Sequence, residues 1–250
     1  MKNFKELDEQ ISPEDIDLKS FKPRDIMNPK IWDPEGKLRK EVRDRLLMIA
    51  DEFYESLELP WVDIEDIVLT GSLANFNWSK FSDVDLHVMV ELTAVDSNAD
   101  LAKEYVNAKK ELWNENHDIT IYGFDVELYV QDVNEKHVSS GVYSVMQDKW
   151  LIKPTKENMV LDTVKIREKA VAIMDQIDAI GETYENGDYN MTIKKITTLK
   201  DKIKKMRQAG LDREGEFSYE NIAFKVLRRN GSLDRLHDLQ IHAVDKSLSL

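Results

Sequence analysis

The first regular pattern of apolar residues lies between positions 40 and 57. Apolar side chains recur there at spacings of four, three, four and four, which follow one face of an α-helix. The residues on this face are Val42, Leu46, Ile49, Phe53 and Leu57. The pattern predicts an amphipathic helix that ends before Pro60, because proline does not fit a helix interior.

Three strands are predicted downstream. Residues 64–70 are rich in isoleucine and valine, residues 83–90 alternate polar and apolar positions, and residues 119–130 alternate again. Gly123 predicts a bend or an interruption in the third strand. Between the second and third strands, apolar residues at helical spacing predict a helix over residues 98–116.

The chain after Pro154 has only helical patterns. Apolar residues recur every three or four positions over residues 166–180 and again over residues 193–206. Ser218 and Ser232 are candidate N-caps of two further helices. The C-terminal hundred residues are therefore expected to form a helical domain.

Together these patterns predict an α/β fold in which a mixed, twisted sheet is followed by a helical domain. Residues 1–40 show little periodicity and are expected to form an irregular arm that wraps the core. Residues 41–153 are assigned to the core that contains the sheet and residues 154–250 to the helical domain.

Composition narrows the class of protein. The 250 residues are 42% apolar and 33% charged, with a mean hydropathy of −0.50. No apolar run approaches the ~18 residues of a membrane span, and the acidic start lacks a secretion signal. The absence of cysteine excludes disulfide scaffolds, thiol nucleophiles and cysteine-based zinc sites. We therefore expect a soluble, cytoplasmic protein without a membrane partner.

Charge is distributed unevenly along the chain. The net charge is −13, but residues 1–150 carry 17 basic and 32 acidic residues, whereas residues 151–250 carry 18 and 16. The most basic stretch is residues 191–230, with 11 basic and 5 acidic residues. The acidic average argues against indiscriminate DNA coating, which needs clustered lysine and arginine. The two halves are expected to have different roles.

One segment, residues 69–86, has the pattern of a chemical site. A predicted strand ends in Gly71 and Ser72, a loop of ten residues follows, and Asp83 and Asp85 open the next strand. Because strand side chains alternate, both carboxylates project from one face, close enough to share a hard divalent cation. Glycine admits a ligand close to the backbone, and a helix start after it would direct amides at an anion. The segment therefore favours a site for a triphosphate and magnesium.

The pattern resembles that of the nucleotidyltransferases of the DNA polymerase beta type. In that family, an apolar residue and Gly-Gly or Gly-Ser precede a loop and an acid–apolar–acid–apolar strand, and a third acid lies on a later strand. The matching segments are Leu69-Thr70-Gly71-Ser72, Asp83-Val84-Asp85-Leu86 and Val126-Glu127-Leu128. The resemblance covers residues 64–130, and a following helical domain is usual in the family. The chain also resembles predicted nucleotidyltransferases encoded by bacteriophages.

The resemblance implies two-metal transfer of a nucleoside monophosphate from an NTP to an acceptor, with release of pyrophosphate. Asp83 and Asp85 would hold both Mg²⁺ (or Mn²⁺) ions, and a third acid would hold the ion that activates the attacking hydroxyl. Gly71 and Ser72 would bind the phosphates. Asp125 fits the pattern of the third acid as well as Glu127 does; we take Glu127 and keep Asp125 as the alternative.

The sequence leaves the acceptor open. An RNA 3′ end, a protein hydroxyl, a nucleotide and a small molecule are all compatible with it, and the basic C-terminal half keeps RNA among the candidates. A noncatalytic nucleotide-binding or antitoxin-like module with the same fold is the competing class. An antibiotic-adenylylating type of transferase is a further alternative.

Several other residues are expected to have plainer roles. Trp78 should cap the core rather than stack on a base, Lys80 should be solvated, and His87 should be satisfied within its strand. Tyr143 is a candidate for lining the nucleotide cleft. A row of lysines flanking one apolar helical stripe is expected to form a solvated face. These lysines are Lys194, Lys195, Lys202, Lys204 and Lys205.

Overall fold

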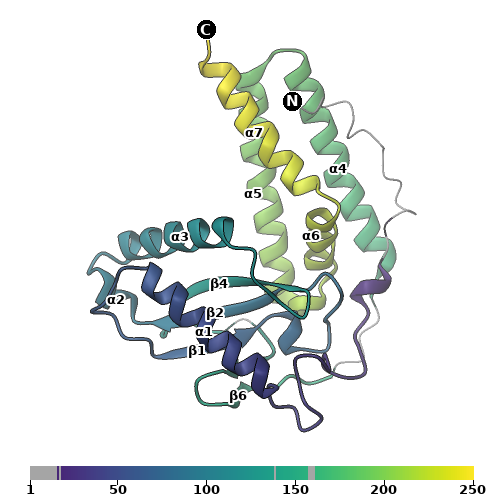
Figure 1. The fold of residues 1–250 in the computed structure, drawn as a ribbon. Coiled ribbons are helices and arrows are strands. Elements are labelled where there is room, and N and C mark those ends of the chain that lie inside the picture. The colour runs from purple at the N-terminus through teal and green to yellow at the C-terminus, as the bar shows by residue number, and fades with distance from the viewer. Residues whose placement is uncertain (1–15, 17, 138, 157–160) are drawn as a thin grey trace. The chain divides into compact units, whose positions relative to one another are not determined.

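A computed structural model describes residues 16, 18–137, 139–156 and 161–250 of the protein. The chain divides into two compact units. One is Ser20–Asn158, and the other combines Met1–Lys19 with Met159–Leu250. Strands and helices build the first unit, here called the sheet unit, and long helices build the second, here called the helical unit (Figure 1).

The described part of the sheet unit contains a mixed six-stranded sheet. Its strands are β1 (Asp66–Thr70), β2 (Val84–Val90), β3 (Thr120–Ile121), β4 (Phe124–Asp132), β5 (Val142–Ser144) and β6 (Lys149–Ile152). Their order is β3-β4-β2-β1-β5-β6, and β2 and β4 are parallel while the other neighbours are antiparallel. The three predicted strand regions are confirmed, and the predicted interruption at Gly123 is the turn between β3 and β4.

Helices pack on one face of this sheet. They are α1 (Lys40–Ser56), α2 (Leu92–Val95) and α3 (Ala99–Asn116). One apolar cluster joins Phe53 of α1 and Val106 of α3 to Leu86 of β2 and Leu128 of β4. The helices predicted from the periodicity are therefore confirmed. Because side chains alternate along strands, the neighbours of these two leucines face the opposite side of the sheet.

Strands β5 and β6 were not expected from the sequence, and they change the interpretation of Tyr143. This side chain lies in β5 and is fully buried, and its hydroxyl donates to Asp148 at 2.7 Å. Its ring packs edge-on against Trp32 and Trp150. The proposal that Tyr143 lines a nucleotide cleft is therefore wrong, because a ring within the aromatic core does not reach a ligand.

The described part of the helical unit contains four α-helices. They are α4 (Thr163–Glu185), α5 (Tyr189–Glu214), α6 (Tyr219–Arg229) and α7 (Ser232–Leu248). Their apolar faces meet in one cluster that includes Ile177 of α4, Ile196 of α5, Leu227 of α6 and Leu239 of α7. Within the described residues, no helix has the length and apolar character to cross a membrane.

The helix caps agree with the sequence at one position and differ at another. Ser218 caps α6 by accepting a hydrogen bond from the Asn221 amide, as expected. Gly231, rather than Ser232, is the N-cap of α7. Its φ of 78° lets the chain reverse directly after α6, which places Ser232 inside the first turn of α7. The predicted fold class, a mixed α/β sheet followed by C-terminal helices, is confirmed.

Candidate functional site

Asp85 and Glu127 lie side by side on the sheet face opposite α1 and α3. The parallel register pairs Asp85 with Glu127 and Leu86 with Leu128. Both leucines are fully buried in the core beneath the helices, so alternation turns both acids to the other face, where they are partly exposed. The fold thus brings together two of the acids predicted from distant segments.

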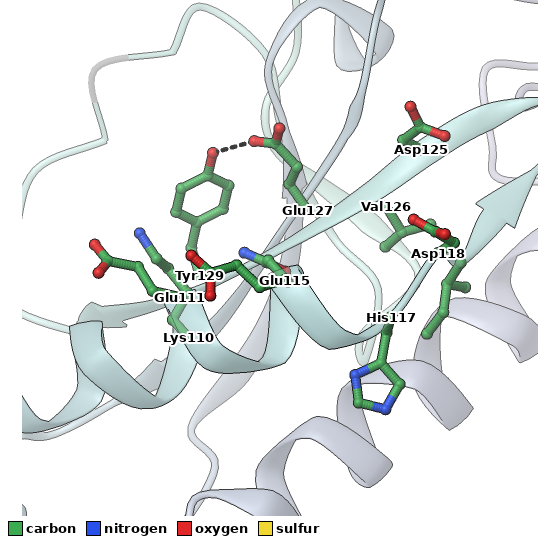
Figure 2. A pocket seen from close by; sticks show the side chains of 11 residues that line it. Lys110, Glu111, Glu115, His117, Asp118, Asp125, Val126, Glu127 and Tyr129 are labelled. Atoms are coloured by element: carbon green, nitrogen blue, oxygen red, sulfur yellow. Dashed lines mark hydrogen bonds between the residues drawn. The ribbon is translucent and has the colours of Figure 1, made fainter. Parts of the chain in front are cut away.

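Asp83 and Asp125 flank this pair where the two strands begin. Asp83 directly precedes β2, and Asp125 is the second residue of β4. Because Val84 pairs with Val126, continuing the register by one residue sets Asp83 beside Asp125. Figure 2 shows the carboxylates of Asp125 and Glu127 on the same side of β4.

Gly71 lies directly against the Asp85 carboxylate. A β-carbon built on Gly71 would stand 1.8 Å from Asp85 Oδ2, far inside any permitted contact. The backbone φ of Gly71 is 72°, in the left-handed region that glycine favours. Since Thr70 pairs with Asp85 across β1 and β2, the sheet register carries the Gly-Ser turn to this acid. Any other residue at position 71 would displace the carboxylate.

The chain after Gly71 differs from the expected helix start. Ser72–Ala74 form a single turn of 3-10 helix, and Asn75 is already extended. The Ser72 hydroxyl donates to Ser82 Oγ at 2.7 Å, and the Ser79 amide donates to the same oxygen at 2.9 Å. These two bonds join the first residue of the turn to Ser79 and Ser82 at the far end of the loop. An anion bound at this turn would be stabilised by the nearby backbone N–H groups, because one 3-10 turn is too short for a helix dipole.

Tyr129 holds the Glu127 side chain in place. The Tyr129 hydroxyl donates to Glu127 Oε2 at 2.5 Å, as drawn in Figure 2. The ammonium of Lys110 on α3 lies 5.2 Å from the centre of the Tyr129 ring. Sequence reasoning missed this contact, although the two-residue spacing already places Tyr129 on the same strand face as Glu127.

A pocket of about 390 Å³ lies between the C-terminal half of α3 and the outer edge of β4 (Figure 2). Asp125 and Glu127 line it, together with Lys110. Asn114 closes the strand edge here, since its side-chain amide bonds both the N–H and the C=O of Leu128 at 3.1 Å. Nothing in the sequence pattern indicated this role of Asn114.

His87 is satisfied within the sheet, as expected. Its Nδ1 lies 2.8 Å from Gln131 Oε1, and its ring stacks on Tyr129. Burial lowers the pKa of His87 to about 4, which keeps the imidazole neutral at physiological pH. His87 therefore supports the Tyr129 ring without adding positive charge beside the acids.

The two loop residues have the plain roles expected of them. Trp78 packs against the core and donates from Nε1 to the carbonyl of Ile26 at 2.9 Å. The Lys80 ammonium, on an exposed side chain, lies 4.7 Å from the centre of the Phe81 ring. Neither observation requires a ligand.

The acids are neighbours on the sheet but do not form a closed cage. Within the described ranges, no three side chains of His, Cys, Asp or Glu are gathered into a ready-made metal-binding group. What the site offers is a pair of adjacent carboxylates, Asp85 and Glu127, with Asp85 seated on the glycine of the Gly-Ser turn.

No protein-family model matches the chain, and no curated protein matches its sequence. Among solved structures, the chain is similar to a STING-associated CdnE c-di-GMP synthase from Capnocytophaga granulosa, with 12% identity over 84% of each chain and a TM-score of 0.22. None of these comparisons supports the resemblance to phage proteins.

Proposed function

We propose that the protein transfers a nucleoside monophosphate from an NTP to an acceptor hydroxyl. The acceptor oxygen bonds to the α-phosphorus, the bond from that phosphorus to the bridging oxygen breaks, and pyrophosphate leaves while the hydroxyl proton passes to water. The observation that carries the proposal is the position of Asp85, in contact with Gly71 and paired with Glu127. An acid pair touching a glycine turn fits a metal-bound triphosphate.

The donor atoms suit magnesium or manganese. Asp83, Asp85 and Glu127 offer only carboxylate oxygens, which these hard cations prefer. Mg²⁺ is commonly held by one or two carboxylates together with substrate phosphates, so a three-acid cage is not needed before the NTP binds. When bound, such ions neutralise the triphosphate and lower the pKa of the attacking hydroxyl.

Glu127 is the better supported third acid. It is the register partner of Asp85, whereas Asp125 pairs with Thr120 at the edge of the sheet and is exposed. Glu127 is also oriented by the Tyr129 hydroxyl. A carboxylate that is fixed before the substrate arrives loses less side-chain entropy on binding a cation. We therefore assign the third position to Glu127.

Tyr129→Phe should slow transfer by about 10- to 100-fold, because loss of a hydrogen bond to a charged group costs about 1.5 to 3 kcal/mol and frees the Glu127 rotamer. The effect should fall on kcat more than on KM for the NTP. Tyr122→Phe is the matched control, since that hydroxyl donates to Glu41 at the surface at 3.3 Å. Equal kcat values in the two variants would argue against a positioning role for Tyr129.

The Gly71 and Ser72 turn is the proposed phosphate contact. Calorimetry should detect NTP binding that requires Mg²⁺, and Ser72→Ala should weaken it by about 1.5 to 3 kcal/mol, the scale of hydrogen bonds to a charged group. Ser82→Ala removes the same internal hydrogen bond but keeps the Ser72 hydroxyl. If both variants weaken binding equally, Ser72 stabilises the conformation of the loop and does not contact the phosphate.

The acceptor stays open in this proposal. An RNA end, a protein hydroxyl, a nucleotide and a small molecule all present a hydroxyl of the required kind. If the protein binds Mg²⁺ and NTP but transfers nothing to any of these, a noncatalytic or antitoxin-like binding module replaces the enzyme.

A further inference from the structure

The helical unit has a long groove between α4 and α5. One hollow of about 1050 Å³ extends toward the start of α6, and another of about 360 Å³ extends toward the start of α5. Both are lined by Gln176, Thr198 and Lys202, and the Lys202 ammonium donates across the groove to Gln176 Oε1 at 2.8 Å where the two hollows adjoin. The groove follows α4 from Lys165 to Ile180, a length of about 22 Å at 1.5 Å per residue.

Lysines dominate the charge of this groove. Six lysines and three acids line it. The lysines are Lys165, Lys169, Lys194, Lys195, Lys202 and Lys205. One acid, Glu220, is buried and already paired, since the Arg213 guanidinium reaches its two oxygens at 3.1 and 2.8 Å. The groove therefore presents a positive surface in a chain whose net charge is −13.

At one end of the groove, three cations gather around a single ring. The ammonium groups of Lys165 and Lys169 lie 5.6 and 5.0 Å from the centre of the Tyr219 ring, and the Arg213 guanidinium carbon lies at 5.2 Å. Carboxylates also hold these cations in place, since Lys165 pairs with Asp162 at 3.0 Å, Lys169 with Glu220 at 3.8 Å and Arg213 with Glu214 at 3.0 Å. The charge at this end is therefore largely compensated, and the lysines of α5 supply most of the positive charge of the groove.

The large apolar side chains of the groove do not form a row. Ile173, Ile180 and Leu199 are 3 to 5% exposed, and the more exposed methionines lie one in each hollow, Met191 with 42% exposed and Met206 partly exposed. An acidic amphipathic helix would need apolar pockets for its anchoring side chains. A single strand of nucleic acid carries one negative charge per nucleotide, which matches lysines that are spread along the whole length of the groove.

We propose that the α4–α5 groove binds single-stranded nucleic acid through its phosphate backbone. Single-strand binding grooves combine positive charge along the backbone path with surfaces that accept the base faces. Four of the five lysines in the row noted from the sequence line the groove, and Lys204 does not. All five are exposed, as expected of a solvated face. The groove belongs to the helical unit, so the proposal does not depend on nucleotidyl transfer.

The test is fluorescence anisotropy with the whole protein and a fluorescein-labelled single-stranded RNA of about 12 nucleotides, a size typical of single-strand sites. No NTP or magnesium is added. The double variant Lys202→Gln with Lys205→Gln should bind about tenfold more weakly at about 50 mM salt. The slope of log K against log salt should shrink by about 1.4, or about 0.7 for each phosphate that is no longer neutralised.

The matched control is Lys204→Gln with Lys246→Gln, which removes the same charge from exposed lysines outside the groove. It should bind within twofold of the wild type. Equal weakening in the two double variants would overturn the proposal, because the effect would then follow net charge alone. Thermal melting of both variants should match the wild type, since all four lysines are exposed.

Three further ligands complete the test. Single-stranded DNA of the same sequence should compete with the RNA, since the proposed contacts are to phosphate. The ratio of the two affinities measures whether the groove distinguishes ribose from deoxyribose. Duplex RNA should compete poorly. If poly-glutamate of equal charge competes as well as the RNA does, the groove is a site for acidic peptides and the proposal fails.

Discussion

Replacing Asp85 with Asn should lower nucleotidyl transfer by at least about a hundredfold, close to 3 kcal/mol of barrier. Asn keeps the shape of the side chain but removes one of the charges proposed to hold the cations, so stabilisation of the transition state suffers more than folding does. The melting temperature should hold or rise, because repulsion from the neighbouring Glu127 carboxylate is relieved. Transfer of label from an NTP and thermal melting measure the two effects.

Asp44→Asn is the control for this experiment. It makes the same change on the exposed surface of α1 and should leave transfer unchanged. If the wild type transfers label and Asp85→Asn transfers it equally well, the assignment of Asp85 is wrong.

Gly71→Ala should have an effect on transfer as large as that of Asp85→Asn, for a different reason. The added methyl group would stand 1.8 Å from Asp85 Oδ2, so the carboxylate must leave its position beside Glu127. The substitution also places a β-carbon on a residue with φ of 72°, which costs about 1 to 2 kcal/mol of unfolding free energy. Transfer assays and urea unfolding separate the two consequences.

Gly123→Ala separates the two causes. Gly123 has φ of 85°, but a β-carbon there meets nothing within 4 Å. The Gly123→Ala variant should lose at most ~1 to 2 kcal/mol of unfolding free energy and should retain its transfer activity. If both glycine variants lose transfer in proportion to stability, the contact with Asp85 has no particular role in the reaction.

The sheet face on which Asp85 and Glu127 lie could be predicted because its signal is local. The alternation of residues 83–90 and of residues 119–130 fixes which side chains face together, and the structure pairs Asp85 with Glu127 as that alternation allows. The register itself is not local. It depends on how β2 and β4 pair within the sheet. The motif fits Asp125 and Glu127 equally well, whereas the pairing places Glu127 beside Asp85.

Other parts were missed because their signal is short or lies elsewhere in the chain. β5 and β6 have three and four residues, too few for alternation to stand out. Asn114 serves β4 from a neighbouring helix, and no spacing rule connects the two. The helix expected after Gly71 is replaced by a single 3-10 turn. The Ser72 hydroxyl there bonds to Ser82, which lies ten residues along the chain, so the signal for this turn is not local.

The most direct measurement of the central claim follows each phosphate of the NTP separately. The protein is incubated with Mg²⁺, candidate acceptors and each NTP, labelled either at the α-phosphate or at the γ-phosphate. The account predicts that α-label appears on an acceptor while γ-label appears only in pyrophosphate, and that removal of the metal by chelation abolishes both. Transfer of the γ-label to an acceptor, or no transfer of α-label from any NTP to any acceptor, would contradict it.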